Sequence, residues 1–292
     1  MAIRTGTAPD SWGVWFPAND RQPPWDRCLD EMQKAGYDGV ELGPWGYLPN
    51  DYEILKSELD KRNLELVAGT ISGDFTNEES VEEMCATIKK IAGLLIKFPS
   101  AKYIVMIQDR YTDELTGDYC LPRYLTGEQK KVLYKNIQKT GDLVRECGLI
   151  PALHPHVECY VDTEEEIEDV LNNTDIDLCF DTGHNIYSGG DPLAFYKKHH
   201  GRIPFLHIKE CDPEIVALAH ANKWTFPKAV AEGAMCEPGS GSIDFKEFFD
   251  FMKSIGYDGW VVVEQDMFPL DDFGKPYEVA ARTRKYLRSA GI

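Results

Sequence analysis

Four short polar segments of this sequence each follow a run of apolar residues. The segments are His154-Pro155-His156, Asp181-Thr182-Gly183-His184, His207-Ile208-Lys209-Glu210 and Val263-Glu264-Gln265-Asp266. Imidazole and carboxylate groups are the nitrogen and oxygen ligands that divalent transition metals commonly take in proteins. Because the apolar runs are short and rich in strand-forming residues, we expect these polar side chains at the ends of β-strands. The pattern therefore predicts a metal site where several strands end.

One side chain from each segment is assigned as a metal ligand: His154, Asp181, His207 and Glu264. Two imidazoles with two carboxylates suit a divalent Mn, Co, Fe or Zn ion, whereas Ca and Mg prefer an all-oxygen shell. Manganese is the cofactor we expect, with the other three as alternatives. A single histidine at a strand end is more often just hydrogen-bonded at the rim, so the prediction depends on all four residues meeting. His156 remains an alternative to His154 as the ligand.

The other polar residues of these segments receive supporting roles. His156 and His184 suit contacts with the ligands or with a substrate. Lys209 would place an ammonium group beside a developing enolate oxygen, although a solvated lysine at the rim fits the sequence nearly as well. Glu210 is expected to be a surface acid.

Aromatic residues follow the first two predicted strands, at Trp12, Trp15, Phe16, Trp45 and Tyr47. Sugars and polyols present apolar C–H faces that stack well on such rings. We therefore assign Trp12, Trp15 and Trp45, together with Glu41 at the end of the second strand, as substrate-binding residues. Ordinary packing beneath loops is the alternative for each ring.

Strand-like and helix-like segments alternate along the whole chain, which is typical of repeated βα units around a parallel sheet. The predicted strands are Ile3–Ala8, Gly39–Leu42, Leu64–Thr70, Tyr103–Ile107, Leu149–His154, Ile176–Asp181, Pro204–Lys209 and Gly259–Glu264. The predicted helices are Pro24–Ala35, Tyr52–Arg62, Glu78–Ile96, Gly127–Cys147, Thr163–Leu171, Asp191–His199, Asp244–Ile255 and Pro276–Ser289. We therefore expect one α/β domain over residues 1–292, a single (β/α)8 TIM barrel. The segments 108–126 and 210–242 are predicted to be long loops that could serve as lids over the mouth.

Composition and charge exclude several classes of partner. A formal net charge of −18 disfavours nucleic acid, which rewards clustered Lys and Arg, and a small neutral substrate is easier to reconcile with it. No stretch approaches the ~18 apolar residues of a membrane span, and the first residues lack the apolar core of a signal peptide. We expect a cytoplasmic protein with no membrane partner. Its eight cysteines form no Cys-x-x-Cys pair and are predicted to be reduced. A homo-oligomer is compatible with the sequence.

Several longer motifs carry a resemblance to a known family. They are Ala8-Pro9-Asp10-Ser11-Trp12-Gly13-Val14-Trp15, Glu41-Leu42-Gly43-Pro44-Trp45-Gly46-Tyr47, the His154, Asp181 and His207 segments above, and Val262-Val263-Glu264-Gln265-Asp266. With these motifs the chain resembles the xylose-isomerase-like barrel superfamily of sugar isomerases, epimerases and dehydratases, and within it the inosose (2-keto-myo-inositol) dehydratases. The resemblance spans nearly the whole chain.

The resemblance implies a metal held by Glu, Asp, His and Glu in many isomerases and epimerases, at the positions of His154, Asp181, His207 and Glu264 here. The first Glu is thus a histidine in this chain, which favours the dehydratase branch. With two carboxylates instead of three, a dication leaves the site neutral and should be a stronger Lewis acid.

The expected activity is that of a metal-dependent lyase that eliminates water from a keto-cyclitol or keto-sugar through an enediolate. Glu264, or another base close to the metal ligands, would remove the α-proton, and an imidazolium at His156 or His184 would protonate the leaving hydroxyl. The alternatives are a ketose isomerase or epimerase, a lyase that removes an aglycone from a 3-keto-glycoside, and a non-catalytic sugar-binding barrel. Endonuclease relatives of the superfamily are disfavoured by the acidic charge.

Overall fold

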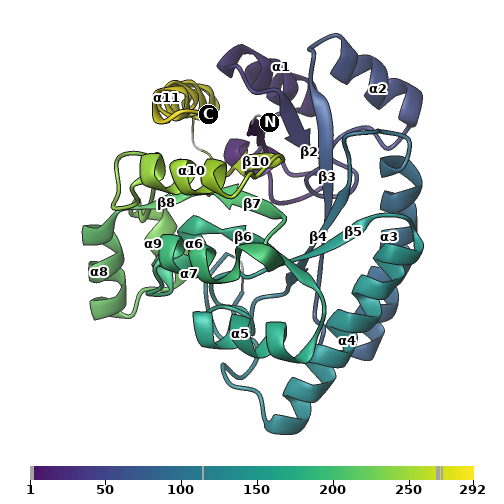
Figure 1. Cartoon of the computed structure of the whole chain (residues 1–292), viewed down its shortest axis with the longest axis vertical. Helices are drawn as coiled ribbons and strands as arrows, with labels where there is room; N and C mark the ends of the chain where they lie inside the picture. Colours follow the sequence, from purple (N-terminus) through teal and green to yellow (C-terminus); the bar gives the residue numbers. More distant parts are fainter. Residues whose placement is uncertain (1–2, 114, 268–269, 271) are drawn as a thin grey trace.

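Eight parallel strands close into a barrel in the computed structural model, which describes residues 3–113, 115–267, 270 and 272–292 (Figure 1). The strands are β1 (Arg4–Thr7), β2 (Gly39–Glu41), β3 (Glu65–Gly73), β4 (Tyr103–Gln108), β5 (Ile150–His154), β6 (Asp177–Asp181), β7 (Phe205–Ile208) and β10 (Trp260–Val263). Each strand pairs with its neighbour in the sequence of barrel strands, and β10 pairs with β1 over Arg4↔Trp260 to Thr7↔Val263 to close the ring. The predicted (β/α)8 barrel is confirmed.

Helices follow the barrel strands on the outside of the ring (Figure 1). They are α1 (Trp25–Ala35), α2 (Tyr52–Asp60), α3 (Glu78–Leu95), α4 (Gly127–Glu146), α5 (Glu164–Asn173), α7 (Pro192–His199), α10 (Phe245–Ser254) and α11 (Lys275–Ala290). The helix starts follow local chemistry. Thr163 and Glu166 form a capping box at α5, and Asp191 accepts a hydrogen bond from the Ala194 amide before Pro192 opens α7. Within the described part of the chain, none of the helices is both long and apolar enough to cross a membrane.

The barrel interior has an apolar floor beneath a polar rim. Val105, Ala152, Cys179, Phe205 and Val262 belong to one buried cluster inside the ring. Side chains alternate along a strand, so residues two positions further on point inward again, one layer higher. From Ala152 this step leads to His154, and from Cys179 to Asp181. This alternation places the polar side chains of His154 and Asp181 directly above the packed apolar cluster.

The segment 210–242, predicted to be a loop, is folded. It contains the antiparallel strands β8 (Glu210–Cys211) and β9 (Met235–Cys236) and the helices α8 (Pro213–Asn222) and α9 (Phe226–Ala231). An apolar cluster that includes Ala219, Phe226 and Ala229 packs it against Val157 and Tyr187. We call this segment the insertion. In the other predicted loop, 108–126, Thr112 pairs with Tyr119 in an isolated bridge, and residue 114 lies outside the described residues.

Glu210 is buried, so its prediction as a surface acid is wrong. Its carboxylate accepts hydrogen bonds from the amides of Cys211 (3.0 Å) and Ile243 (3.2 Å), and thereby ties the start of the insertion to the chain that leaves it. Burial raises the pKa of Glu210 from its ordinary value of 4.5 to about 7, against the lowering effect of the backbone amides that bind it.

This shift predicts a pH-dependent contribution to stability. Because the pKa of Glu210 is higher in the folded chain, its stabilising contribution is fully present below its unfolded pKa and is lost as the pH rises through about 7. The free energy of unfolding of the wild type, relative to that of Glu210→Gln, should therefore fall between pH ~5 and ~8. Urea unfolding of both proteins, stripped of metal, measures this difference.

The matched control is Glu214→Gln, the same chemical change at an exposed position of the insertion. Its difference from the wild type should stay flat over the same range. A flat difference for Glu210→Gln, or one that grows with pH, would contradict the prediction.

Candidate metal centre

The four predicted ligands meet at the carboxyl end of the barrel. His154 and Asp181 are the last residues of β5 and β6, His207 lies in β7, and Glu264 directly follows β10. One ligand atom from each lies within 4.8 Å of the others. All four residues are 8% exposed or less, so an ion held there would be reached by solvent only through the cavity above. This end of a (β/α)8 barrel is where the active sites of such enzymes lie.

Two buried polar atoms at this centre make no hydrogen bond with the described residues: Asp181 Oδ2 and His207 Nδ1. Asp181 Oδ1 accepts hydrogen bonds from the amides of Gly183 (2.7 Å) and His184 (2.9 Å), which leaves Oδ2 directed to the centre. His207 Nδ1 lies 3.0 Å from Glu264 Oε2 and 4.0 Å from Asp181 Oδ2. Orphaned polar atoms in a protein interior are costly. A divalent cation would satisfy both, so the donor set fits a transition-metal ion.

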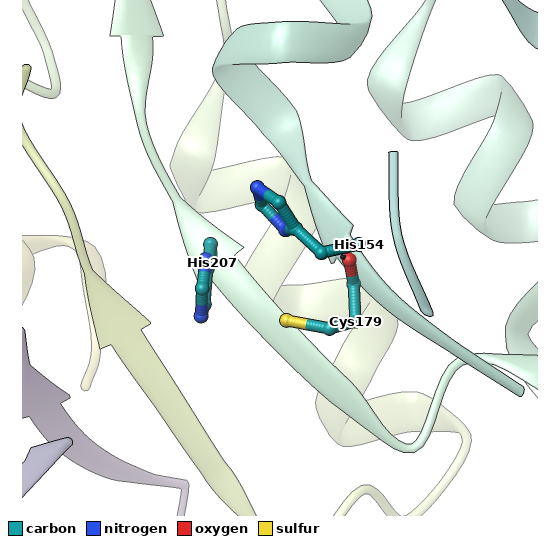
Figure 2. A group of neighbouring side chains, drawn as sticks. All are labelled: His154, Cys179 and His207. Atoms are coloured by element: carbon teal, nitrogen blue, oxygen red, sulfur yellow. Dashed lines mark hydrogen bonds between the residues drawn. The ribbon is translucent and has the colours of Figure 1, made fainter. Parts of the chain in front are cut away.

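His154 and His207 face the centre together with a residue that the sequence analysis missed, Cys179. Figure 2 shows its thiol directed toward the space between the two imidazoles, and the three donor atoms lie within 4.8 Å of one another. His154 Nδ1 is 3.3 Å from the Cys179 carbonyl oxygen, a contact that places the ring proton on Nδ1 and leaves Nε2 for an ion. Burial raises the pKa of Cys179 to about 12, so the thiol is a neutral wall of the centre.

Glu41, predicted to bind substrate, also contacts a predicted ligand. Its Oε1 lies 2.8 Å from His207 Nε2, and both side chains are buried. A proton on Nε2 that is donated to this carboxylate leaves Nδ1 as the metal-binding nitrogen. A carboxylate bonded to a ligand histidine in this way fixes the tautomer and the ring orientation. Glu41 also lines the cavity, but its first structural role is to position His207.

Lys209 is fully buried, so the alternative of a solvated lysine at the rim is wrong. Its Nζ lies 3.1 Å from Asp266 Oδ2, 3.3 Å from Glu264 Oε2 and 3.4 Å from Asp181 Oδ2. Although burial would lower the pKa of Lys209, these carboxylates raise it well above its ordinary value. Lys209 therefore remains a cation beside the centre. Asp266, the acid closest to it, was quoted in the sequence motif but given no role.

His156 and His184 lie side by side above the centre, with ring centroids 3.9 Å apart. Lys209 Nζ is 3.0 Å from His184 Nε2 and donates to it, while His156 Nδ1 lies 2.8 Å from the Val157 carbonyl oxygen and donates there. Burial, and after it the nearby positive groups, lower the pKa of His156 to about 4 and that of His184 well below its ordinary value. Near neutral pH both rings are thus uncharged, which argues against the imidazolium proton donor predicted from the sequence.

A cavity of about 610 Å³ opens above the centre. Trp15, Phe16 and Trp45 line it, as the sequence suggested. Trp12 does not: it is fully buried in the core, and its indole donates a hydrogen bond to Glu31 (2.8 Å). The sequence could not separate these rings because all of them follow strand ends. The structure separates them by the 3-10 helix η1 (Pro9–Trp12), which turns Trp12 inward.

Three further residues of the cavity wall were missed: Asp10, Arg110 and Phe226. Phe226 comes from the insertion and packs edge-on against His156, with ring centroids 5.7 Å apart. Glu158 joins both predicted lid segments, since it pairs with Arg110 (3.3 Å) and accepts a hydrogen bond from the Phe226 amide (2.9 Å). The contact between Glu158 and Phe226 exists only because the insertion is folded. The strand and helix patterns of the sequence therefore could not predict it.

The protein is a closed (β/α)8 barrel with a cluster of possible metal ligands at the carboxyl ends of its strands. A family model described as a xylose isomerase-like TIM barrel matches residues 29–290. The chain belongs to this family.

Two curated relatives give a more particular likeness. The chain is 31% identical over 300 residues to the inosose dehydratase of Geobacillus thermodenitrificans (strain NG80-2), covering 98% of this chain and 96% of the relative. It is 32% identical over 306 residues to the inosose dehydratase of Bacillus thuringiensis (strain Al Hakam), covering 99% and 98%.

Solved structures share the fold at lower identity. A probable 3-DHS dehydratase from Bacillus anthracis superposes with a TM-score of 0.73 at 15% identity, covering 98% of this chain and 99% of that one. An L-ribulose 3-epimerase gives 0.70 at 18% identity, covering 99% and 94%.

The contact between Glu41 and His207 predicts an effect on metal affinity. Glu41→Gln keeps the size of the side chain but removes the charge that holds the proton on His207 Nε2. We expect the affinity for Mn²⁺ to fall about 10- to 100-fold. Calorimetric titration of chelator-stripped protein measures it.

Glu83→Gln provides the control, because Glu83 is an exposed carboxylate on the wall of the same cavity. Its Mn²⁺ affinity should match that of the wild type. Unchanged affinity in Glu41→Gln, or an equal loss in both variants, would refute the positioning role.

Proposed function

We propose that this protein is a divalent-metal-dependent lyase that eliminates water from a neutral keto-cyclitol or keto-sugar, with 2-keto-myo-inositol as the first substrate to test. The observation that carries the proposal is the convergence of His154, Asp181, His207 and Glu264 within 4.8 Å beneath a cavity with aromatic walls. The relatives named inosose dehydratases support the reaction class. Manganese is the ion we propose.

Different residues of the centre would serve different steps of such an elimination. An ion held by the four ligands would polarise the ketone oxygen and acidify the adjacent C–H bond. Glu264 is the proposed base for that proton, because its carboxylate faces the cavity. The ammonium group of Lys209, fixed by three carboxylates, would stabilise negative charge that develops on the substrate oxygen.

The cavity walls favour a polyol. Trp15 and Trp45 offer ring faces for C–H stacking, and carboxylates and imidazoles between them offer hydrogen-bond partners for hydroxyl groups. A net charge of −18 is consistent with a substrate that carries no negative charge.

Cavity size supports a second candidate, elimination of an aglycone from a 3-keto-glycoside. A volume of about 610 Å³ lies in the range that holds drug-sized ligands, and so exceeds what one cyclitol ring fills. The same base and ion would serve both reactions. Epimerisation of a ketose is the third outcome, and it is distinguished by a product without new unsaturation.

The main prediction concerns the product. Mn²⁺-loaded protein mixed with 2-keto-myo-inositol should generate an unsaturated or dione product, with an ultraviolet absorbance that grows only in the presence of metal. Glu264→Gln should reduce this rate by at least ~100-fold, since it removes both a ligand and the proposed base. Time-resolved absorbance with a chelator control measures both effects.

If 2-keto-myo-inositol gives no new absorbance but an aglycone is released from a 3-keto-glycoside, the elimination of an aglycone would replace dehydration as the proposed reaction. A change in optical rotation without absorbance would indicate an epimerase. Full activity of Glu264→Gln would contradict the site assignment itself.

A further prediction concerns the insertion, which we propose covers the mouth together with the segment 108–126. Phe226→Ala removes the ring that the insertion places in the cavity wall. Loss of an aromatic contact on the order of 1 kcal/mol should raise KM about fivefold with a smaller change in kcat. Steady-state kinetics on the active substrate measure this.

Trp224→Ala is the matched control, an aromatic deletion in the same insertion at a residue that does not line the cavity. It should leave KM unchanged. An equal rise in KM for both variants would assign the effect to the stability of the insertion and not to a substrate contact.

A further inference from the structure

Glu158 adopts a backbone conformation that side chains usually avoid. Its φ is +61°, in the left-handed region that favours glycine. It lies in the connection between β5 and α5, and it does not line the cavity itself. Backbone strain of this kind persists only where the surrounding contacts hold it in place. The side chain of Glu158 must therefore make contacts that a glycine could not.

The carboxylate of Glu158 binds both of the predicted lid segments. Its Oε2 accepts a hydrogen bond from Thr112 Oγ1 and pairs with Arg110 Nη2 (3.3 Å), both from the segment 108–126. Its Oε1 accepts a hydrogen bond from the amide of Phe226 (2.9 Å), the first residue of α9 in the insertion. Helix α9 has no capping hydrogen bond from its own N-cap side chain. Glu158 thus satisfies an amide that the helix geometry leaves without a partner.

The two segments also touch each other directly. Gly117 of the first segment lies so close to Thr225 of the insertion that a Cβ atom at Gly117 would overlap the threonine side chain. The guanidinium carbon of Arg110 lies 5.5 Å from the centroid of the Phe226 ring, in cation–π contact. Together with the bonds to Glu158, these contacts join the two segments into one wall of the cavity.

Arg110 is the residue of this wall that can bind a ligand in the cavity. It lines the cavity, and its contacts with the described residues go through Nε and Nη2, to Thr112, the Asp113 carbonyl oxygen and Glu158. Nη1 takes part in none of these contacts, and it is not one of the buried polar atoms that lack a partner. Its two N–H groups are therefore accessible to oxygen atoms of a ligand.

We infer that Arg110 binds a hydroxyl group of the substrate through Nη1, and that Glu158 is the positioning residue that holds Arg110 against the Phe226 ring. The inference rests on the proposed function and deepens it: the substrate is a polyol held at two places, by the ion and by a cationic donor of the wall. A charged donor strengthens the hydrogen bond to a hydroxyl oxygen. A guanidinium that is already fixed loses less conformational freedom on binding.

Glu158→Gly and Arg110→Ala, alone and together, test this inference. Glycine adopts the positive φ without strain, so the turn should survive the loss of the side chain. On Mn²⁺-loaded protein with 2-keto-myo-inositol, each single variant should raise KM about 10-fold. The change in kcat should stay within about twofold, because the lost binding is uniform. The double variant should fall well short of the roughly 100-fold rise in KM that independent effects would give.

Lys223→Gly is the matched control, the same relief of a positive φ (+52°) at an exposed residue of the insertion. Its KM should equal that of the wild type. Glu158→Gln is a second variant of similar size: its amide oxygen can still accept from Phe226, but it cannot form an ion pair with Arg110, so KM should rise. Hydrogen exchange of the Phe226 amide, followed by NMR, should accelerate in Glu158→Gly but not in Glu158→Gln or Lys223→Gly.

A wild-type KM in Glu158→Gly, or a rise that multiplies with that of Arg110→Ala, would overturn the inference and leave the proposed function intact. A parallel loss of kcat and Mn²⁺ affinity would also overturn it, because damage to the whole fold would explain that result. Unchanged exchange at Phe226 in Glu158→Gly would overturn the positioning role without any substrate. If the wild type leaves 2-keto-myo-inositol unchanged, the proposed function fails, and the substrate contact of Arg110 fails with it.

Discussion

The arrangement at the carboxyl end of the barrel depends on one electrostatic constraint: four carboxyl groups act on the buried ammonium group of Lys209, and a fifth, Glu41, lies against His207. The four are Asp10, Asp181, Glu264 and Asp266. Buried charges must be paired, bound to a metal or neutralised. Each acid is treated in one of these ways. His207 pairs with Glu41, and Lys209 with Asp266. Asp181 and Glu264 would share an ion, and burial raises the pKa of Asp10 well above its ordinary value, toward the neutral form. These are separate solutions to this single problem of charge.

The apolar floor of the barrel makes the constraint severe. Phe205 and Tyr103 stack beneath the centre with ring centroids 4.7 Å apart, and Cys179 places a neutral thiol, not a charge, directly below the imidazoles. Low polarity strengthens every interaction between the charges above it. The same environment lowers the pKa of His156 and raises that of Asp10. Burial thus shifts the pKa of each group in the direction that favours its neutral form.

The sequence predicted the features that depend on local pattern. Strand periodicity placed all eight barrel strands within a few residues, and the four predicted ligands converge because each lies at or next to the end of a strand. The missed features depend on tertiary contacts. Glu210 is a charged residue that usually lies on the surface, but one of the amides that bind it, that of Ile243, is 33 residues away in the sequence. Trp12 and Trp15 belong to one motif, and only the turn of η1 sends one to the core and the other to the cavity. Cys179 could have been found, since it precedes Asp181 by two residues on the same face of a strand.

The predicted ligands and the residues around the mouth come from different parts of this chain. The predicted ligands and Lys209 lie at or next to the ends of barrel strands, which the closed ring of hydrogen bonds holds in register. Arg110, Glu158 and Phe226 come from segments that follow the strands, and Glu158 joins the other two. A change in those segments can therefore reshape the mouth without moving the charges beneath it. Solved structures that share this fold carry the names of a dehydratase and an epimerase, so the fold alone does not fix the reaction.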